Sequence, residues 1–188
     1  NFAWYERFGD TAFVFGPAMT QLYGVLSLRL ANADLLPYDV PRYARDLKTH
    51  FRASEEEIRT YHPAFSAASL LLAADRLETV SGQFIGAMEK TLRSASPPSA
   101  KLAHVNQRLI ALEKSFIDSE GMHFGAWYQS LYAAPDPYSG YAAWMLPGLK
   151  YEASRTGTNE LPVWEARYLN AVKNLSRKIE VLTRELRK

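Results

Sequence analysis

Apolar side chains recur at intervals of three and four residues along most of this chain, a spacing that predicts amphipathic helices. The longest such seam begins near Glu160 and continues to the end of the chain. Its members are Leu161, Trp164, Tyr168, Val172, Leu175, Ile179, Leu182 and Leu186. A helix with one continuous apolar seam packs against its neighbours at a shallow angle, as helices do in bundles.

The same rhythm predicts helices over residues 65–93 and 99–116. The first carries Leu70, Ala73, Leu77, Val80, Phe84 and Met88, and the second Leu102, Val105, Leu109, Leu112 and Phe116. No segment alternates apolar and polar residues as a half-buried strand does. We therefore predict an all-α fold, an up-and-down four-helix-bundle-like domain that takes in residues 1–188 as a single domain.

Helix-capping residues place the starts of the earlier helices. Asp10 or Thr11 can accept hydrogen bonds from the free N–H groups of a helix over residues 12–31, and Asp39 can cap the next one. The expected apolar faces carry Phe15, Met19, Leu22 and Leu26 in the first helix, and Tyr43, Leu47 and Phe51 in the second. Residues 54–57, Ser-Glu-Glu-Glu, match a capping box and predict a separate short helix.

The interval 116–151 breaks the helical pattern. It contains seven of the twenty Gly and Pro residues: Gly121, Gly125, Pro135, Pro137, Gly140, Pro147 and Gly148. It also contains nine aromatic residues: Phe116, Phe124, Trp127, Tyr128, Tyr132, Tyr138, Tyr141, Trp144 and Tyr151. We expect a long ordered loop before the last helix, which either serves a function or folds back to plug the end of the bundle.

Composition and charge exclude several classes of protein. The 188 residues are 47% hydrophobic and 22% charged, with a formal net charge of +2, which gives no support for nucleic-acid binding. There is no Cys, so disulfides and thiolate metal sites are excluded. No apolar run is long enough to cross a membrane, so we expect no direct membrane insertion. The opening NFAWYERFGD is no signal peptide, and we interpret the chain as excised from a larger multidomain protein.

Candidate catalytic and metal-binding patterns are missing. The histidines, His50, His62, His104 and His123, form no metal-ligand motif, and no Ser has a partnering His nearby in sequence. We expect no catalytic residue, no metal and no cofactor in this chain. The basic residues of the last helix could face an anionic surface, but intervening acids favour a solvated outer face. Asn174-Leu175-Ser176 is a glycosylation sequon, which suggests a secretory-route protein.

Three sequence segments resemble a known family. They are ERFGD with LANADLLPYD within residues 6–39, ALEKSFID at 111–118, and WYQSLYAAPDPYSGYAAWMLPGL at 127–149. Together they resemble the transferrin receptor-like dimerisation domain, the C-terminal helical domain of glutamate carboxypeptidase-like zinc peptidases and of transferrin receptors. The resemblance implies a homodimer that follows a protease-associated domain and a peptidase domain in the full-length protein and contacts both. It also implies zinc in the absent peptidase domain.

The resemblance further implies a substrate-pocket loop formed by Ser139, Gly140 and Tyr141. In the carboxypeptidases of this family, a Lys-Tyr pair grips the carboxylates of a glutamate-ended peptide. Tyr141 matches that Tyr, but Gly140 stands in place of the Lys and offers only its backbone N–H. Gln129-Ser130 likewise replaces the Arg-His common in the family. We expect a preference for uncharged C-terminal residues, with Tyr138, Trp144 and Met145 as possible lining of an apolar pocket.

Two functions therefore stand side by side. The first is a homodimerisation domain of a zinc peptidase, whose loop contributes to the substrate pocket. The second is a non-catalytic receptor-like or scaffold interaction module. In either case we expect a soluble domain from the lumenal or extracellular part of a membrane-anchored secretory-route protein.

Overall fold

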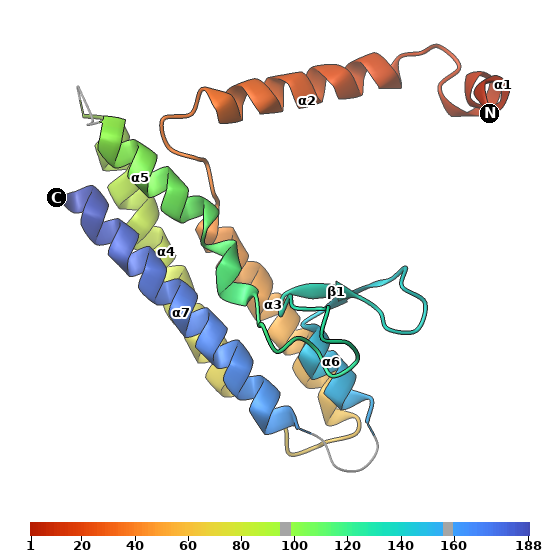
Figure 1. Ribbon diagram of the computed structural model, residues 1–188, viewed down its shortest axis with the longest axis vertical. Helices are drawn as coiled ribbons and strands as arrows, with labels where there is room; N and C mark the ends of the chain where they lie inside the picture. Colours follow the sequence, from red (N-terminus) through yellow and green to blue (C-terminus); the bar gives the residue numbers. More distant parts are fainter. Residues whose placement is uncertain (95–98, 156–159) are drawn as a thin grey trace. The chain divides into compact units, whose positions relative to one another are not determined.

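The computed structural model describes residues 1–94, 99–155 and 160–188, and most of these residues are helical (Figure 1). Contacts divide the chain into two compact units, Asn1–Pro37 and Tyr38–Lys188. The predicted all-α, bundle-like fold is confirmed, with one small two-stranded sheet added to it.

The first unit consists of helix α1 (Phe2–Trp4), a π-helical turn η1 (Tyr5–Gly9) and helix α2 (Phe15–Ala31). Helix α2 begins at Phe15 rather than near residue 12. Asp10 serves its start as the sequence predicts, because its carboxylate accepts the N–H groups of Val14, Phe15 and Gly16 at 2.8, 2.8 and 3.1 Å. These bonds satisfy donors that the first turn of a helix leaves without partners.

Helix α2 is apolar around its whole circumference, whereas the sequence predicts one apolar face. Every residue of α2 is exposed, and Arg29 is its only charged residue. Its large exposed side chains are Phe15, Met19, Leu22, Tyr23, Val25, Leu26, Leu28 and Leu30. A helix that is apolar on all sides is typical of the interior of a larger protein or of a membrane. Among the described residues, no helix has the length and apolar character that a membrane crossing needs.

The second unit is a helical bundle. Its long helices are α3 (Val40–Arg59), α4 (Ala68–Leu92), α5 (Ser99–Ile110) and α7 (Leu161–Arg187). Helices α3, α4 and α5 alternate in direction, and α7 packs along α4 (Figure 1). All eight members of the predicted α7 seam are buried, and of the predicted seam in α4 every member is buried except Met88, which is half-buried. Each large apolar side chain buried in this way contributes roughly 1.5–3 kcal/mol.

Helix α3 corrects one local prediction. Asp39 caps it as expected, accepting the Arg42 N–H at 3.0 Å. The predicted short helix at 54–57 is wrong, because α3 continues without a break to Arg59 and Ser54 is buried inside it. The apolar stripe of Leu47, Phe51 and Ile58 continues through this point, so burial overrides the local capping pattern. Glu55 instead accepts the N–H of Ala67 at 3.1 Å, just before α4.

The aromatic interval contains regular structure. A 3₁₀ turn η2 (Glu113–Phe116) precedes strands β1 (Ala133–Pro135) and β2 (Ala143–Met145), and helix α6 (Pro147–Ala153) follows. The strands pair antiparallel, with Ala134 opposite Trp144. Three residues are too few for an alternating pattern, which is why the sequence indicates only a loop here.

Candidate functional site

The hairpin tip, residues 136–142, joins β1 to β2 and contains the predicted loop residues. Asp136 is 6% exposed and holds the tip together. Its Oδ1 accepts the N–H groups of Tyr138 and Ser139 at 2.9 and 2.6 Å. Its Oδ2 accepts the Ala142 N–H at 3.1 Å and the Ser139 hydroxyl. The hydrogen bond from the Ser139 hydroxyl, followed by those from the backbone, lowers the pKa of Asp136 to about 2.

Backbone bonds complete the tip. Asp136 N–H donates to the Ala142 carbonyl at 2.8 Å, and Gly140 N–H donates to the Asp136 carbonyl at 3.0 Å. Tyr141 N–H donates to Ser139 Oγ at 3.3 Å. Since Pro137 has no N–H, every backbone N–H from 136 to 142 is used within the tip. The Gly140 N–H, which the sequence suggests as a substrate donor, is therefore already engaged.

Two tyrosine rings project from this ordered tip. Tyr138 is 77% exposed and Tyr141 is 97% exposed. Gly140 between them has φ of +70°, a left-handed conformation that glycine adopts readily, and open space surrounds its missing side chain. The tip does not plug the end of the bundle, because its predicted site residues Ser139, Gly140 and Tyr141 are all exposed.

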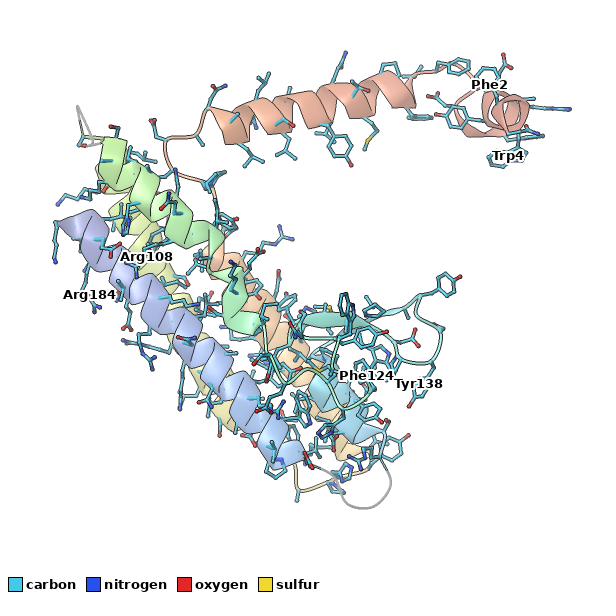
Figure 2. The ribbon with its side chains drawn as sticks, viewed as in Figure 1. Phe2, Trp4, Arg108, Phe124, Tyr138 and Arg184 are labelled. Carbon is cyan, nitrogen blue, oxygen red and sulfur yellow. The ribbon has the colours of Figure 1, made fainter. Side chains whose placement is uncertain are left out.

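The predicted pocket-lining residues are only partly brought together. Tyr138 meets Trp144 edge to face, with ring centroids 5.9 Å apart. Trp144 in turn contacts Phe124, with ring centroids 6.3 Å apart. Figure 2 labels Phe124 and Tyr138, the two outer members of this aromatic group. Met145 is half-buried and follows Trp144 directly in β2, and consecutive strand residues point to opposite faces. Met145 therefore does not share the face that carries Tyr138 and Trp144.

A cation lies beside this aromatic face. The Lys150 ammonium lies 5.5 Å from the centroid of the Trp144 ring, within the range of a cation–π interaction. The same ammonium lies 3.3 Å from a carboxylate oxygen of Glu57 in α3. The hairpin face is therefore linked to the bundle through α6, the helix that carries Lys150.

The segment after β2 fixes the hairpin to α7. A Cβ at Gly148 would lie 2.1 Å from the Trp164 ring, so only glycine permits this approach. Gly148 N–H donates to the Tyr168 hydroxyl at 3.1 Å. Tyr168 is fully buried, and burial raises the pKa of its hydroxyl. The Pro-Gly-Leu sequence therefore forms the close contact through which α6 packs on α7.

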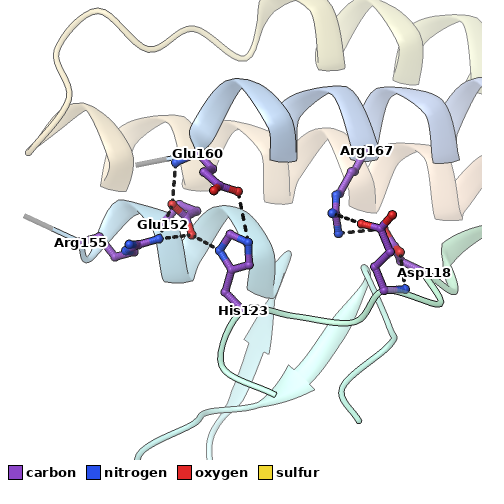
Figure 3. Close-up of polar contacts among 7 residues, drawn as sticks. Asp118, His123, Glu152, Arg155, Glu160 and Arg167 are labelled. Atoms are coloured by element: carbon purple, nitrogen blue, oxygen red, sulfur yellow. Dashed lines mark hydrogen bonds and ion pairs between the residues drawn. The ribbon is translucent and has the colours of Figure 1, made fainter. Parts of the chain in front are cut away.

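A buried carboxylate ties the same region together (Figure 3). Glu152 of α6 has no exposed side-chain surface and contacts His123 Nδ1 at 2.7 Å. It also accepts the Glu160 N–H at 2.7 Å and bonds Arg155 at 3.3 Å. Burial acts to raise the pKa of Glu152, but these hydrogen bonds outweigh burial and the pKa is lowered. The carboxylate is thus held ionised where the chain enters α7.

Arg167 of α7 forms a neighbouring polar contact. Its guanidinium bonds Asp118 at 3.3 Å (Figure 3) and also pairs with Glu120. It lies over the Trp164 ring with 4.7 Å between the guanidinium carbon and the ring centroid. The segment that precedes the hairpin is therefore fixed to the same turn of α7 as the segment that follows it.

The histidines are not arranged as metal ligands. His123 Nε2 lies 3.2 Å from Glu160, so both of its ring nitrogens face carboxylates. His104 lies on α5, with its Nε2 3.8 Å from a carboxylate oxygen of Glu185. Within residues 1–94, 99–155 and 160–188, no group of three or more His, Cys, Asp or Glu side chains could hold a metal ion. The described residues do not fit a zinc site.

Sequence reasoning missed Asp136, Phe124 and Lys150. A signal for Asp136 was present, because an Asp before Pro and three residues before Ser is typical of a turn whose carboxylate bonds nearby N–H groups. Phe124 and Lys150 lie far from Trp144 in the sequence, and no local pattern indicates their contacts.

Comparison with known proteins agrees with the resemblance noted in the sequence. A family model described as the transferrin receptor-like dimerisation domain matches residues 65–187, about two thirds of the chain. Probable glutamate carboxypeptidase LAMP1 of Arabidopsis thaliana is 28% identical over 149 residues, 79% of this chain and 21% of the relative.

Two more relatives extend this picture. Probable glutamate carboxypeptidase VP8 of Zea mays is 27% identical over 161 residues, 83% of this chain and 22% of the relative. Aminopeptidase NAALADL1 of Rattus norvegicus is 24% identical over 141 residues, 74% of this chain and 19% of the relative. The chain thus spans about a fifth of the length of these relatives. With most of its length matched by the family model, the chain belongs to the transferrin receptor-like dimerisation domain family.

Proposed function

We propose that this chain is the homodimerisation domain of a glutamate carboxypeptidase-like zinc metallopeptidase. The family match and the names of the plant relatives support this proposal. In this proposal the chain supplies no catalytic residue, and within residues 1–94, 99–155 and 160–188 no group of three or more His, Cys, Asp or Glu side chains could hold a metal ion. Zinc and the residues that activate water belong to a peptidase domain elsewhere in the full-length protein, which this chain contacts together with a protease-associated domain.

We further propose that the hairpin tip contributes to the substrate pocket of that peptidase domain. The observation that carries this proposal is an ordered tip with exposed rings: Tyr141 is 97% exposed, although hydrogen bonds to Asp136 and Ser139 hold the backbone around it. An exposed aromatic side chain on a rigid support loses little conformational entropy on binding. Such a tip is suited to insertion into a neighbouring domain.

The test of the pocket role is Tyr141→Phe in the full-length protein, assayed on dipeptides. Losing one hydroxyl bond to a charged acceptor costs about 1.5–3 kcal/mol, so kcat/KM should fall about ten- to a hundredfold. Tyr61→Phe is the matched control, because Tyr61 is also exposed, at 64%, but follows α3. Equal activity of both variants and the wild type would rule out a role for the Tyr141 hydroxyl.

Self-association is tested by sedimentation velocity of the full-length protein. An obligate homodimer buries upwards of ~2,000 Å². A protein of this kind stays dimeric at nanomolar to low micromolar concentration. A monomer at high micromolar concentration would contradict the dimerisation role.

The alternative is a non-catalytic receptor-like or scaffold interaction module. The observation that favours it is Gly140, because the tip has no cation where the resemblance implies a Lys and its N–H groups are used internally. One experiment distinguishes the interaction module from the peptidase domain. The module predicts a dimer that hydrolyses no dipeptide, whereas the peptidase predicts hydrolysis that a chelator abolishes.

We also propose that the parent protein is membrane-anchored and follows the secretory route, with this domain on the lumenal or extracellular side. The sequon is the supporting feature: Asn174 is exposed on α7, whereas Ser176 is buried and donates to the Val172 carbonyl at 3.0 Å. Expression in a secreting host should give a glycoform that Asn174→Gln removes, as measured by gel mobility. Absence of any glycan on secreted material would contradict the use of this sequon.

A further inference from the structure

The hairpin tip has an unusual distribution of hydrogen-bond donors. Its six backbone N–H groups and the Ser139 hydroxyl all donate to acceptors within residues 136–142. The carboxylate of Asp136 alone accepts four of these seven bonds. Loops that bind anions do the opposite, because their successive N–H groups point outward into a concave site.

Asp136 also gives the tip a negative charge. Its pKa of about 2 keeps the carboxylate ionised at neutral pH, and within residues 136–142 it is the only ionisable group besides the two tyrosines. The donors that remain for a binding partner are the hydroxyls of Tyr138 and Tyr141, both exposed. Two exposed phenol rings therefore project from the tip, and the anion that orders it is buried.

We propose that Asp136 is a specificity-determining residue that orders the tip and directs its N–H donors inward, so that the tip selects an uncharged group over a carboxylate. This inference rests on the proposed function in one respect, since the selected group is the C-terminal side chain of a peptide substrate. Asp136 acts through the residues that it positions and is a positioning residue, with the tyrosine rings as the contacting groups.

The first experiment uses the 188-residue chain and needs no peptidase activity. Amide exchange and a glutarate titration are followed by NMR in the wild type, Asp136→Ala and Asp136→Asn. In Asp136→Ala, the amides of Tyr138, Ser139 and Ala142 lose their acceptor, and their protection should fall about tenfold or more. The freed N–H groups should then shift on addition of glutarate, whereas those of the wild type should not.

Asp136→Asn is the graded variant. Its side-chain oxygen can still accept from Tyr138 and Ser139, but its amide nitrogen cannot accept from Ala142. Protection at Tyr138 and Ser139 should therefore be largely rescued, while Ala142 stays unprotected. Asp39→Ala is the matched control, because Asp39 also accepts a backbone N–H, that of Arg42, in the same unit. It should leave the amides of the tip unchanged.

The second experiment measures kcat/KM of the full-length protein on dipeptides ending in Leu and in Glu. Asp136→Asn should reduce the Leu-to-Glu preference about tenfold, since it removes a like charge and frees donors. The proposal is overturned if amide protection of the tip and its response to glutarate are the same in the wild type and both Asp136 variants. It is also overturned if these properties differ but the preference for Leu-ended over Glu-ended dipeptides stays the same. A full-length protein without any hydrolysis would reject the peptidase function, while the glutarate result would still decide the role of Asp136.

Discussion

At the residue scale, the backbone conformation of Gly140 disfavours the Lys that the family resemblance implies at this position. The resemblance implies a Lys at this position, and the space around Gly140 would admit one. The φ of +70° opposes it, because a residue with a Cβ in left-handed conformation costs roughly 1–2 kcal/mol. The absence of the Lys and the shape of the tip are therefore linked, and a substitution here changes both charge and conformation.

Gly140→Lys in the full-length protein should raise the rate on Glu-ended relative to Leu-ended dipeptides. A cation paired with a buried carboxylate is worth ~2–5 kcal/mol, so a gain of about tenfold or more is expected even after the backbone strain. Gly140→Asn is the control, because Asn tolerates the left-handed conformation and adds no charge. A wild-type preference for Glu, or an equal gain in both variants, would contradict this expectation.

At Gly148, a larger side chain would destabilise the fold for a steric reason alone. Gly148→Ala places a methyl group 2.1 Å from the Trp164 ring, and overpacking of this kind costs about 1–3 kcal/mol. Gly82→Ala is the matched control: Gly82 lies within α4 with nothing within 4 Å of its missing Cβ, so Ala should stabilise the helix by about 0.5–1 kcal/mol. Urea denaturation of the two variants should move the midpoint in opposite directions. A Gly148→Ala midpoint equal to that of the wild type would mean that Trp164 can move aside.

At the scale of elements, the long helices follow from the sequence and the polar contacts between elements do not. All eight residues of the predicted α7 seam are buried, because their burial follows from the spacing of apolar residues within one helix. The hairpin is missed because each strand has three residues. His123 and Glu152 are 29 residues apart, and nothing local indicates that the carboxylate is buried against the imidazole. The resemblance indicated the candidate site, and the spacing of Asp136 and Ser139 indicates a turn, but the four hydrogen bonds that the Asp136 carboxylate accepts are visible only in the structure.

The α6–α7 junction should lose stability in acid. The folded-state pKa of Glu152 lies below its ordinary value of 4.5, so the carboxylate stabilises the fold above that value, and the stabilisation is lost as pH falls through the lowered pKa. Glu152→Gln should lower the free energy of unfolding by about 1–3 kcal/mol at pH 7. Between neutral and acid pH, this variant should lose less stability than the wild type does. Thermal unfolding at several pH values measures both effects. Glu89→Gln is the control, because its pair with Arg93 is exposed and should contribute less than ~1 kcal/mol. If the unfolding temperatures of the wild type and Glu152→Gln changed with pH in the same way, the loss of stability in acid would not come from Glu152.

At the scale of the whole molecule, the two units differ in how much of their apolar side-chain surface is buried. Tyr38–Lys188 buries a continuous core, and the family match at 65–187 falls inside it. Asn1–Pro37 leaves α2 apolar and exposed. Self-association of the chain therefore has two possible sources, the bundle of the dimerisation family and the uncovered surface of α2.

A fragment of residues 38–188 separates these sources. It should unfold within a few degrees of the complete chain, because the core lies within it. If dimerisation belongs to the bundle, the fragment should remain dimeric in sedimentation velocity, while concentration-dependent association beyond the dimer should disappear. A fragment that is strictly monomeric would assign the association to α2, and one that fails to fold would show that the first unit is part of the folding core.

The closed hydrogen bonding of the hairpin tip separates the residues that shape the turn from the residues that it displays. Asp136 binds backbone N–H groups, and apart from the Ser139 hydroxyl it accepts no hydrogen bond from the side chains that project from the tip. Positions 138 and 141 can therefore exchange residues while the turn keeps its shape. Substitutions at these two positions would change what the tip presents to a partner and leave its backbone scaffold in place. Replacing only these two residues and measuring amide protection of the tip would test whether the scaffold is independent of them.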